Sequence, residues 1–186
     1  MIAAFYLLLI VGHLGVFDVL YFHLYLCKLQ ERAECHREVF WHTVRHAVYG
    51  SQFIIVANLR FHGFALLALA LLYAVDVLVA WSDVLEETVS RRSQGGLPSG
   101  EYFMHIVLSL LVGCYFVLVA QSVWPDRLLE TGVVIDPPAV PLVLRTYMTI
   151  MGVAAFSAFF YDLRKWIVFG RTPAAVAIAA GKAQVW

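Results

Sequence analysis

Long apolar runs alternate with short polar connectors along the chain. A helix needs about 20 mostly apolar residues to cross a hydrocarbon core about 30 Å thick. Five segments approach this pattern, at 2–27, 39–59, 63–87, 102–124 and 142–163. Gly and Pro in the connectors SRRSQGGLPSG and PDRLLETGVVIDPPAVP indicate loops. The pattern predicts an all-α, polytopic transmembrane bundle of about five spans over 1–170, followed by a cytoplasmic tail at 171–186.

The amino-acid composition also favours a lipid bilayer as the surroundings of the chain. Hydrophobic residues make up 62% of it and charged residues 14%, against about 25% charged in soluble domains. So much apolar surface would leave large patches in water, so membrane lipids are the expected surroundings. The net charge of zero and the absence of a basic run give no sign of a nucleic-acid partner. Cys27, Cys35 and Cys114 form no CxxC pair and are expected to be reduced thiols.

The distribution of Lys and Arg predicts the orientation. With five spans and the N-terminus outside, nine of the 13 basic residues fall in the inner segments. Only Arg60 and Arg127 fall in the outer ones. This bias follows the positive-inside rule, so the N-terminus is expected outside and the C-terminus in the cytoplasm.

In this orientation four spans bring ionisable residues to the cytoplasmic half of the membrane. At about 100° per residue, Asp76 and Asp83 lie about 20° apart around their helix. Asp18 and His23, five residues apart, are expected on different faces, so that one of them joins the others directly. Ionisable residues spaced by four share one face of a helix. Two further sets have this spacing, one of Glu38, His42 and His46 and one of Glu101 and His105.

Ionisable side chains inside a membrane cost about 2.5–3.5 kcal/mol each even on lenient scales, so they face the interior of the bundle and pair. Bound cations, arginines or protons can neutralise such a cluster. Arg45 is expected to be the only basic residue at that depth, while reaching headgroup water is an alternative for Glu38, Glu86 and Glu87. Metal ions are therefore the favoured partners, since carboxylates and imidazoles suit iron, manganese or zinc.

The sequence thus predicts a dinuclear site at the cytoplasmic end of a four-helix core, with the fifth helix as a lateral wall. We expect Arg45, Glu101 and His23 to hold the ligands in orientation and assist the chemistry. The expected metal ligands are Asp18, His42, His46, Asp76, Asp83, Glu87 and His105.

The segment HTVRH, at 42–46, resembles the first His-x-x-x-His box of membrane desaturases and hydroxylases, whose diiron sites face the cytoplasm. The resemblance covers five residues, and the His-x-x-His-His boxes of that family are absent. EYFMH likewise departs from the Glu-x-x-His motif of ferritin-type proteins. The chain as a whole resembles small polytopic membrane proteins of bacteria, which implies the bacterial inner membrane but no particular chemistry.

The favoured function is an oxidoreductase in which two iron ions oxidise a lipophilic substrate with O₂, whereas a zinc pair would suit hydrolysis. A b-type haem or quinone-linked electron-transfer subunit is the first alternative, with His46 and His105 as a haem-ligating pair. A cation- or proton-coupled transporter and a structural subunit of a membrane complex are further alternatives, since the same acids could serve either.

Overall fold

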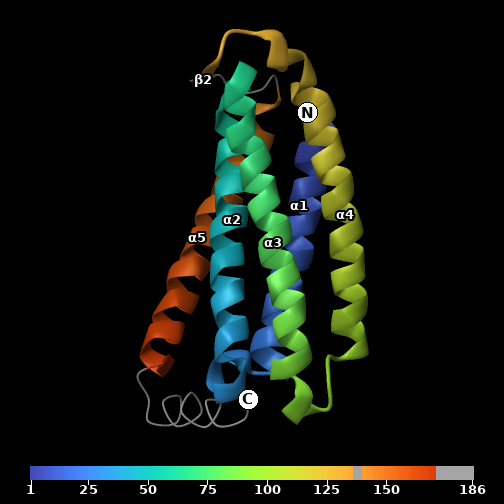
Figure 1. Cartoon of the computed structure of the whole chain (residues 1–186), viewed down its shortest axis with the longest axis vertical. Coiled ribbons are helices and arrows are strands. Elements are labelled where there is room, and N and C mark those ends of the chain that lie inside the picture. The colour runs from blue at the N-terminus through green and yellow to red at the C-terminus, as the bar shows by residue number, and fades with distance from the viewer. Residues whose placement is uncertain (136–139, 171–186) are drawn as a thin grey trace.

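Five helices run alternately up and down, so that helices adjacent in sequence are antiparallel (Figure 1). The structure, a computed structural model, describes residues 1–135 and 140–170; the predicted tail lies outside them. At one end of the bundle α3 ends and α4 begins around Arg91, and we call this the Arg91 end; the N-terminus lies at the other. The helices are α1 (Ile2–Asp18), α2 (His36–Asn58), α3 (Leu66–Ser90), α4 (Ser99–Val123) and α5 (Leu142–Gly170).

Four helical segments of the described chain are long and apolar enough to cross a membrane. They are Ile2–Leu26, Gly63–Ser90, Ser99–Leu128 and Leu142–Val168. The remaining helix, α2, corresponds to the most polar of the five predicted spans. It packs against α3 and α5, so neighbouring helices cover much of its polar surface. This position explains how the bundle accommodates a helix that is less apolar than the others.

The outer surface of the bundle is apolar, and ionisable groups are buried inside it. On α3, Leu67, Leu71, Leu78, Trp81 and Leu85 are all exposed. Buried ionisable side chains come from all five helices and from the segments beside them. This distribution suits a lipid environment, in which exposed leucines cost nothing and charges are directed inward. The helices therefore fit an integral membrane protein.

The interior is divided along its length. Toward the N-terminal end the core is apolar, with Phe5, Leu8, Phe53 and Met148 packed together beside Tyr115. Toward the Arg91 end the buried groups become carboxylates, imidazoles and guanidinium groups. Dispersion and close packing stabilise the first half, whereas ion pairs and hydrogen bonds must stabilise the second.

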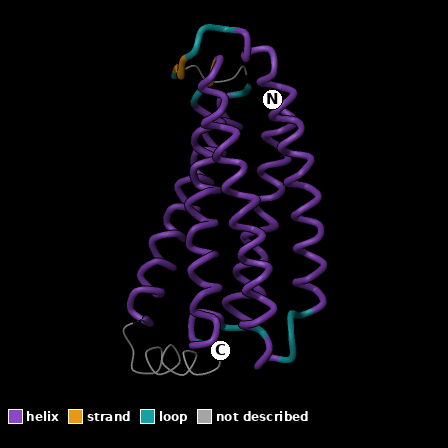
Figure 2. Tube along the Cα trace, in the orientation of Figure 1, coloured by secondary structure: helices purple, strands orange, loops and turns teal. Residues whose placement is uncertain are grey.

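A small sheet closes the N-terminal end of the bundle, a feature that the all-α prediction missed. β1 (Arg60–His62) pairs antiparallel with β2 (Gly132–Val134), and Figure 2 shows both as the short strands at that end. Arg60 donates two hydrogen bonds to Asp126, at 3.0 and 3.1 Å. A bidentate guanidinium–carboxylate pair fixes orientation as well as distance. The sheet and this pair tie the α2–α3 connection to the segment that follows α4.

Close approach of two backbones holds α5 against α2. A Cβ atom added to Gly50 would lie 3.2 Å from the carbonyl oxygen of Gly152, and one added to Gly152 would lie 3.1 Å from that of Gly50. The Gly50 position would also place a Cβ 2.8 Å from the ring of Phe156. Small residues permit such contact between membrane helices.

We expect Gly50→Leu to lower the free energy of unfolding by about 1–3 kcal/mol, because the larger side chain overpacks the interface. Thermal unfolding in detergent, followed by circular dichroism, measures the change. The control is Gly113→Leu in α4, where an added Cβ meets nothing within 4 Å. Equal melting temperatures for the two variants would contradict the proposed packing.

Candidate metal centre

A π-helix at the end of the first helix brings Asp18, a predicted ligand, together with His23, which was predicted to orient the ligands. The π-helix spans Val19–Leu26 and directly continues α1. Its N–H groups bond five residues back, as Cys27 does to the carbonyl of Phe22 at 2.8 Å. Residues five apart then lie above one another. The expectation that Asp18 and His23 occupy different faces is therefore wrong: their side chains lie 3.4 Å apart.

Asp18, His23 and His105 form the first group of atoms that could hold a metal ion. One ligand atom from each lies within 4.8 Å of the other two. The Oδ2 atom of Asp18 is 3.4 Å from the Nε2 atoms of both histidines. His105 comes from α4, so this group joins the first and fourth helices.

Glu38, His42 and Glu87 form the second group, again with ligand atoms within 4.8 Å of one another. Glu38 and His42 are one turn apart on α2, and Glu87 lies on α3. All three are buried. This group therefore joins the second and third helices at the same end of the bundle.

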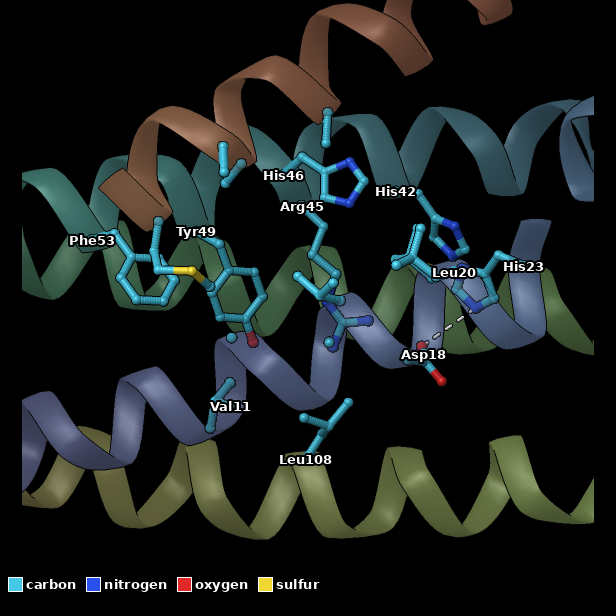
Figure 3. A pocket seen from close by; sticks show the side chains of 18 residues that line it. Val11, Asp18, Leu20, His23, His42, Arg45, His46, Tyr49, Phe53 and Leu108 are labelled. Carbon is cyan, nitrogen blue, oxygen red and sulfur yellow. Dashed lines mark ion pairs between the residues drawn. The ribbon is translucent and has the colours of Figure 1, made fainter. Parts of the chain in front are cut away.

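The two groups are in direct contact. The rings of His23 and His42 stack with their centroids 4.3 Å apart and their planes 15° from parallel. Glu87 Oε2 lies 3.5 Å from His105 Nδ1, so a carboxylate of the second group also touches the first. Figure 3 shows Asp18 and His23 on neighbouring turns of the first helix, with His42 facing His23 from α2. The arrangement has the form of two adjacent three-ligand positions.

Several atoms in these groups lack a hydrogen-bond partner. Asp18 Oδ1, His23 Nδ1 and Glu87 Oε1 are buried, and none has such a partner within 1–135 and 140–170. The three residues are 5%, 5% and 3% exposed. Buried polar atoms are nearly always partnered, so exceptions in one cluster require an explanation. A cation could use the lone pairs that such atoms leave free.

Arg91 lies inside this end of the bundle and is 1% exposed. It donates to Glu38 at 2.7 Å and to Glu101 at 2.8 Å. The prediction that Arg45 is the only basic group at this depth is wrong, and so is the alternative that Glu38 reaches headgroup water. Burial acts to lower the pKa of Arg91, but its hydrogen bonds to Glu38 and the charges of Glu38 and Glu101 act more strongly and raise it. Arg91 is therefore a fixed cation.

Carboxylates outnumber guanidinium groups at this end. His23 Nε2 lies 3.0 Å from Glu101 Oε1, so the acids bonded to Arg91 are continuous with the first group. Three negative charges remain to be neutralised if the imidazoles are neutral, and protons or bound cations must do so. The count rests on five carboxylates, Asp18, Glu38, Asp83, Glu87 and Glu101, and two guanidinium groups, Arg45 and Arg91.

Asp83 lies beside the second group. Its two oxygens are each 3.0 Å from a partner, His42 Nε2 and Arg45 Nη1. A carboxylate that contacts an imidazole in this way fixes the orientation of the ring. The same contact could orient His42 toward an ion or, with modest movement, make Asp83 itself a ligand.

The structure does not bring Asp76 or His46 into either group. Asp76 accepts a hydrogen bond from Gln52 at 2.8 Å. His46 Nδ1 lies 3.1 Å from Asp162 Oδ2 on α5. The fifth helix thus contributes a buried carboxylate that was not predicted. Asp162 stands beside Arg164 and Lys165 at the end of the predicted span, where an acid is expected to be solvated.

The burial of Glu38 and Glu86 was also not predicted. Glu38 is 0% exposed and belongs to the second group. Glu86 is 7% exposed and lies 3.3 Å from Arg37, so the alternative that it is solvated is wrong. The one-turn spacing of Glu38 and His42 was a usable signal for the first of these, whereas no local signal distinguishes Glu86.

The cysteines are free, as predicted, and neither group includes one. Burial raises the pKa of the Cys35 thiol to about 12. The thiolate is the form that binds metals, so this thiol stays protonated at neutral pH. The donors gathered here are oxygen and nitrogen atoms.

A cavity of about 240 Å³ adjoins the groups between α1, α2 and α5. Asp18, His23 and His42 line one end of it, and Val11 and Phe53 lie farther along (Figure 3). Comparison of the chain with protein-family models, with curated proteins and with solved structures finds no match. The chemistry of the site must therefore be argued from its own residues.

We expect Arg91→Met to lower the free energy of unfolding by about 3–5 kcal/mol, because it leaves Glu38 and Glu101 buried without their counterion. Denaturation of the detergent-solubilised protein measures the loss. Arg92→Met is the matched control, since Arg92 is the next residue and is exposed. Adding Glu101→Gln to Arg91→Met should recover part of the stability; no difference between Arg91→Met and the control would refute the role of this ion pair.

Proposed function

We propose that the protein is an integral membrane metalloprotein that holds two transition-metal ions at the Arg91 end. The observation that carries the proposal is the contact between the two ligand groups through the stacked rings of His23 and His42. Paired carboxylate and imidazole ligands projected inward from several helices are the usual way a bundle holds two metals. The excess of buried carboxylates supports this, since cations offset it.

Each residue of the site would have one of two roles, binding a metal ion or orienting a ligand. Asp18, His23 and His105 would hold one ion, and Glu38, His42 and Glu87 the other. Asp83 and Arg45 would orient His42, and Glu101 would restrain His23 through their 3.0 Å contact. Oxygen and nitrogen donors suit iron, manganese and zinc; we favour iron, which would supply one-electron and O₂ chemistry when bound.

An oxidoreductase acting on a lipophilic substrate is the activity we favour. The cavity beside the ligand groups is lined mainly by apolar side chains and lies between membrane-type helices. An apolar molecule dissolved in the bilayer would reach the metal ions through it without crossing water. Zinc-dependent hydrolysis lacks a comparable argument, because the same cavity offers few routes for water.

The same proposal places the Arg91 end at the cytoplasmic face of a bacterial inner membrane, with the N-terminus outside. The basic residues near this end support it by the positive-inside rule. They include Lys28, Arg32, Arg37 and Arg92.

The b-type haem alternative uses His46 and His105. Both would have to leave carboxylate partners, Asp162 for His46 and Asp18 and Glu87 for His105. A transporter or a structural subunit would use the same acids as proton or ion-pair groups without firmly bound metal. Spectra and metal content separate all of these from the proposed centre.

We expect detergent-purified protein to contain about two transition-metal ions per chain, measured by elemental analysis together with an absorption spectrum. His105→Ala and His42→Ala should each lose metal, because each removes a ligand from a three-ligand position. His13→Ala is the control: His13 also belongs to the first helix, but its contacts are Leu9 and Tyr147.

Folded protein without metal would overturn this function and favour the transporter or structural alternatives. A Soret band that disappears in His46→Ala would favour haem. Equal metal loss in His13→Ala and His105→Ala would show that the loss reflects damage to the fold rather than removal of a ligand.

A further inference from the structure

Small residues of α1 and α5 line the cavity beside the ligand groups, which we call the slot; they are Gly12, Gly15, Ala154, Ala155 and Ala158. A Cβ atom added to Gly15 would meet nothing within 4 Å, so the space there is open. On α2, the aromatic rings of Tyr49 and Phe53 also line the cavity. Small residues leave room for a planar ring, and the aromatic side chains offer it a stacking surface.

The slot opens toward the surface that would face lipid. Val16 and Leu20 line it and are 49% and 56% exposed, so they form its rim rather than its floor. Figure 3 shows α5 diverging from α2 toward the end of the cavity at which Asp18, His23 and His42 lie. A molecule with a long apolar tail could therefore keep the tail in the bilayer.

One end of the slot is polar and has both a donor and a proton acceptor. Arg45 lines it and gives one N–H to Asp83, and its guanidinium group has five N–H donors in all. His46 also lines it, with Nδ1 beside Asp162 at 3.1 Å. With one ring nitrogen beside a carboxylate, the other ring nitrogen is available to accept a proton from a ligand in the slot. Gln30 donates a hydrogen bond to Asp162, which extends the chain toward the Arg91 end.

The polar end and the lining of the slot favour some classes of lipophilic ligand over others. A plain alkyl chain would make no hydrogen bond with the N–H groups of Arg45 that Asp83 does not use, which is costly once water is displaced from them. A fatty acid would bring a further negative charge beside Asp18 and Asp83, where carboxylates already outnumber guanidinium groups. A neutral ring with oxygen substituents accepts a hydrogen bond from the donor, packs against the aromatic side chains of Tyr49 and Phe53 and adds no charge.

We propose that this slot binds the ring of a membrane quinol or quinone, with one ring oxygen at Arg45 and His46 and the tail leaving between α1 and α5. The assignment rests on the proposed function for the fate of the electrons. Two quinols would give two quinones, passing four electrons and four protons to one O₂ to form two waters. His46 would receive a hydroxyl proton and pass it toward Asp162.

Binding of decylubiquinone to the detergent-purified protein tests the proposal, with equilibrium dialysis to give Kd. We expect Gly15→Leu to raise Kd by about tenfold or more, because the added side chain occupies the slot. Gly113→Leu, the same change on the outer surface of α4, should bind within about twofold of the wild type. His46→Gln, which removes the imidazole from the polar end of the slot, should raise Kd as well and does not depend on how the leucine packs.

Palmitate and hexadecane are the competitors. If either displaces decylubiquinone as well as unlabelled quinone does, the polar end does not select a ring and the proposal is overturned. Unchanged Kd in both Gly15→Leu and His46→Gln would also overturn it, since the quinone would then bind elsewhere.

Metal content, measured on the same samples, keeps this inference separate from the proposed function. Quinone binding in protein that never holds metal would support the slot and overturn the metal centre. Two metals per chain with no quinone binding would do the reverse, leaving a metal centre that acts on a different lipophilic molecule.

Discussion

Charge neutralisation inside an apolar bundle is the constraint on which the Arg91 end depends. Each buried carboxylate must find a guanidinium group, a proton or a cation, because water is excluded. Arg91 meets the largest part of this demand by bonding Glu38 of α2 and Glu101 of α4 from the end of α3. Three helix ends are thereby fixed in register. His42, Glu87 and His105, each about one turn from these anchors, can then face a common centre.

The first helix reaches that centre by a change in its backbone. An uninterrupted α-helix would turn His23 away from Asp18, and only one of them could join the others. The π-helix at Val19–Leu26 rotates His23 back over Asp18 and against the ring of His42. Such irregular turns are frequent at functional sites. Here the irregularity coincides with the place where the two ligand groups touch.

The slot and the ligand groups together suggest one path for chemistry. Val16 and Leu20 lie at its rim, small residues of α1 and α5 line it, and its polar end meets Arg45, His46 and the ligand groups. The dyad of His46 and Asp162 lies outside both groups. In the proposed reaction, this dyad would accept protons while metal ions held by the ligand groups would accept electrons. The fifth helix, expected to be a passive wall, supplies half of this dyad.

The sequence alone determined the membrane character, the helices and the end of the bundle at which acids and histidines gather. Apolar runs of about 20 residues and one-turn spacings are local properties, and the five helices follow them closely. Local periodicity also placed Asp18, His42, Glu87 and His105 at a common depth.

The tertiary structure decided which of those residues meet. It buried Arg91 and Glu38, which the sequence places beside a loop, because their partners come from other helices. It paired His46 with Asp162 across 116 positions of sequence and left Asp76 with Gln52. It also gave Val19–Leu26 a π-helical backbone, which the hydrophobic periodicity of the sequence does not predict. Depth along a helix can be read from spacing, but direction and partner depend on how helices pack around one another.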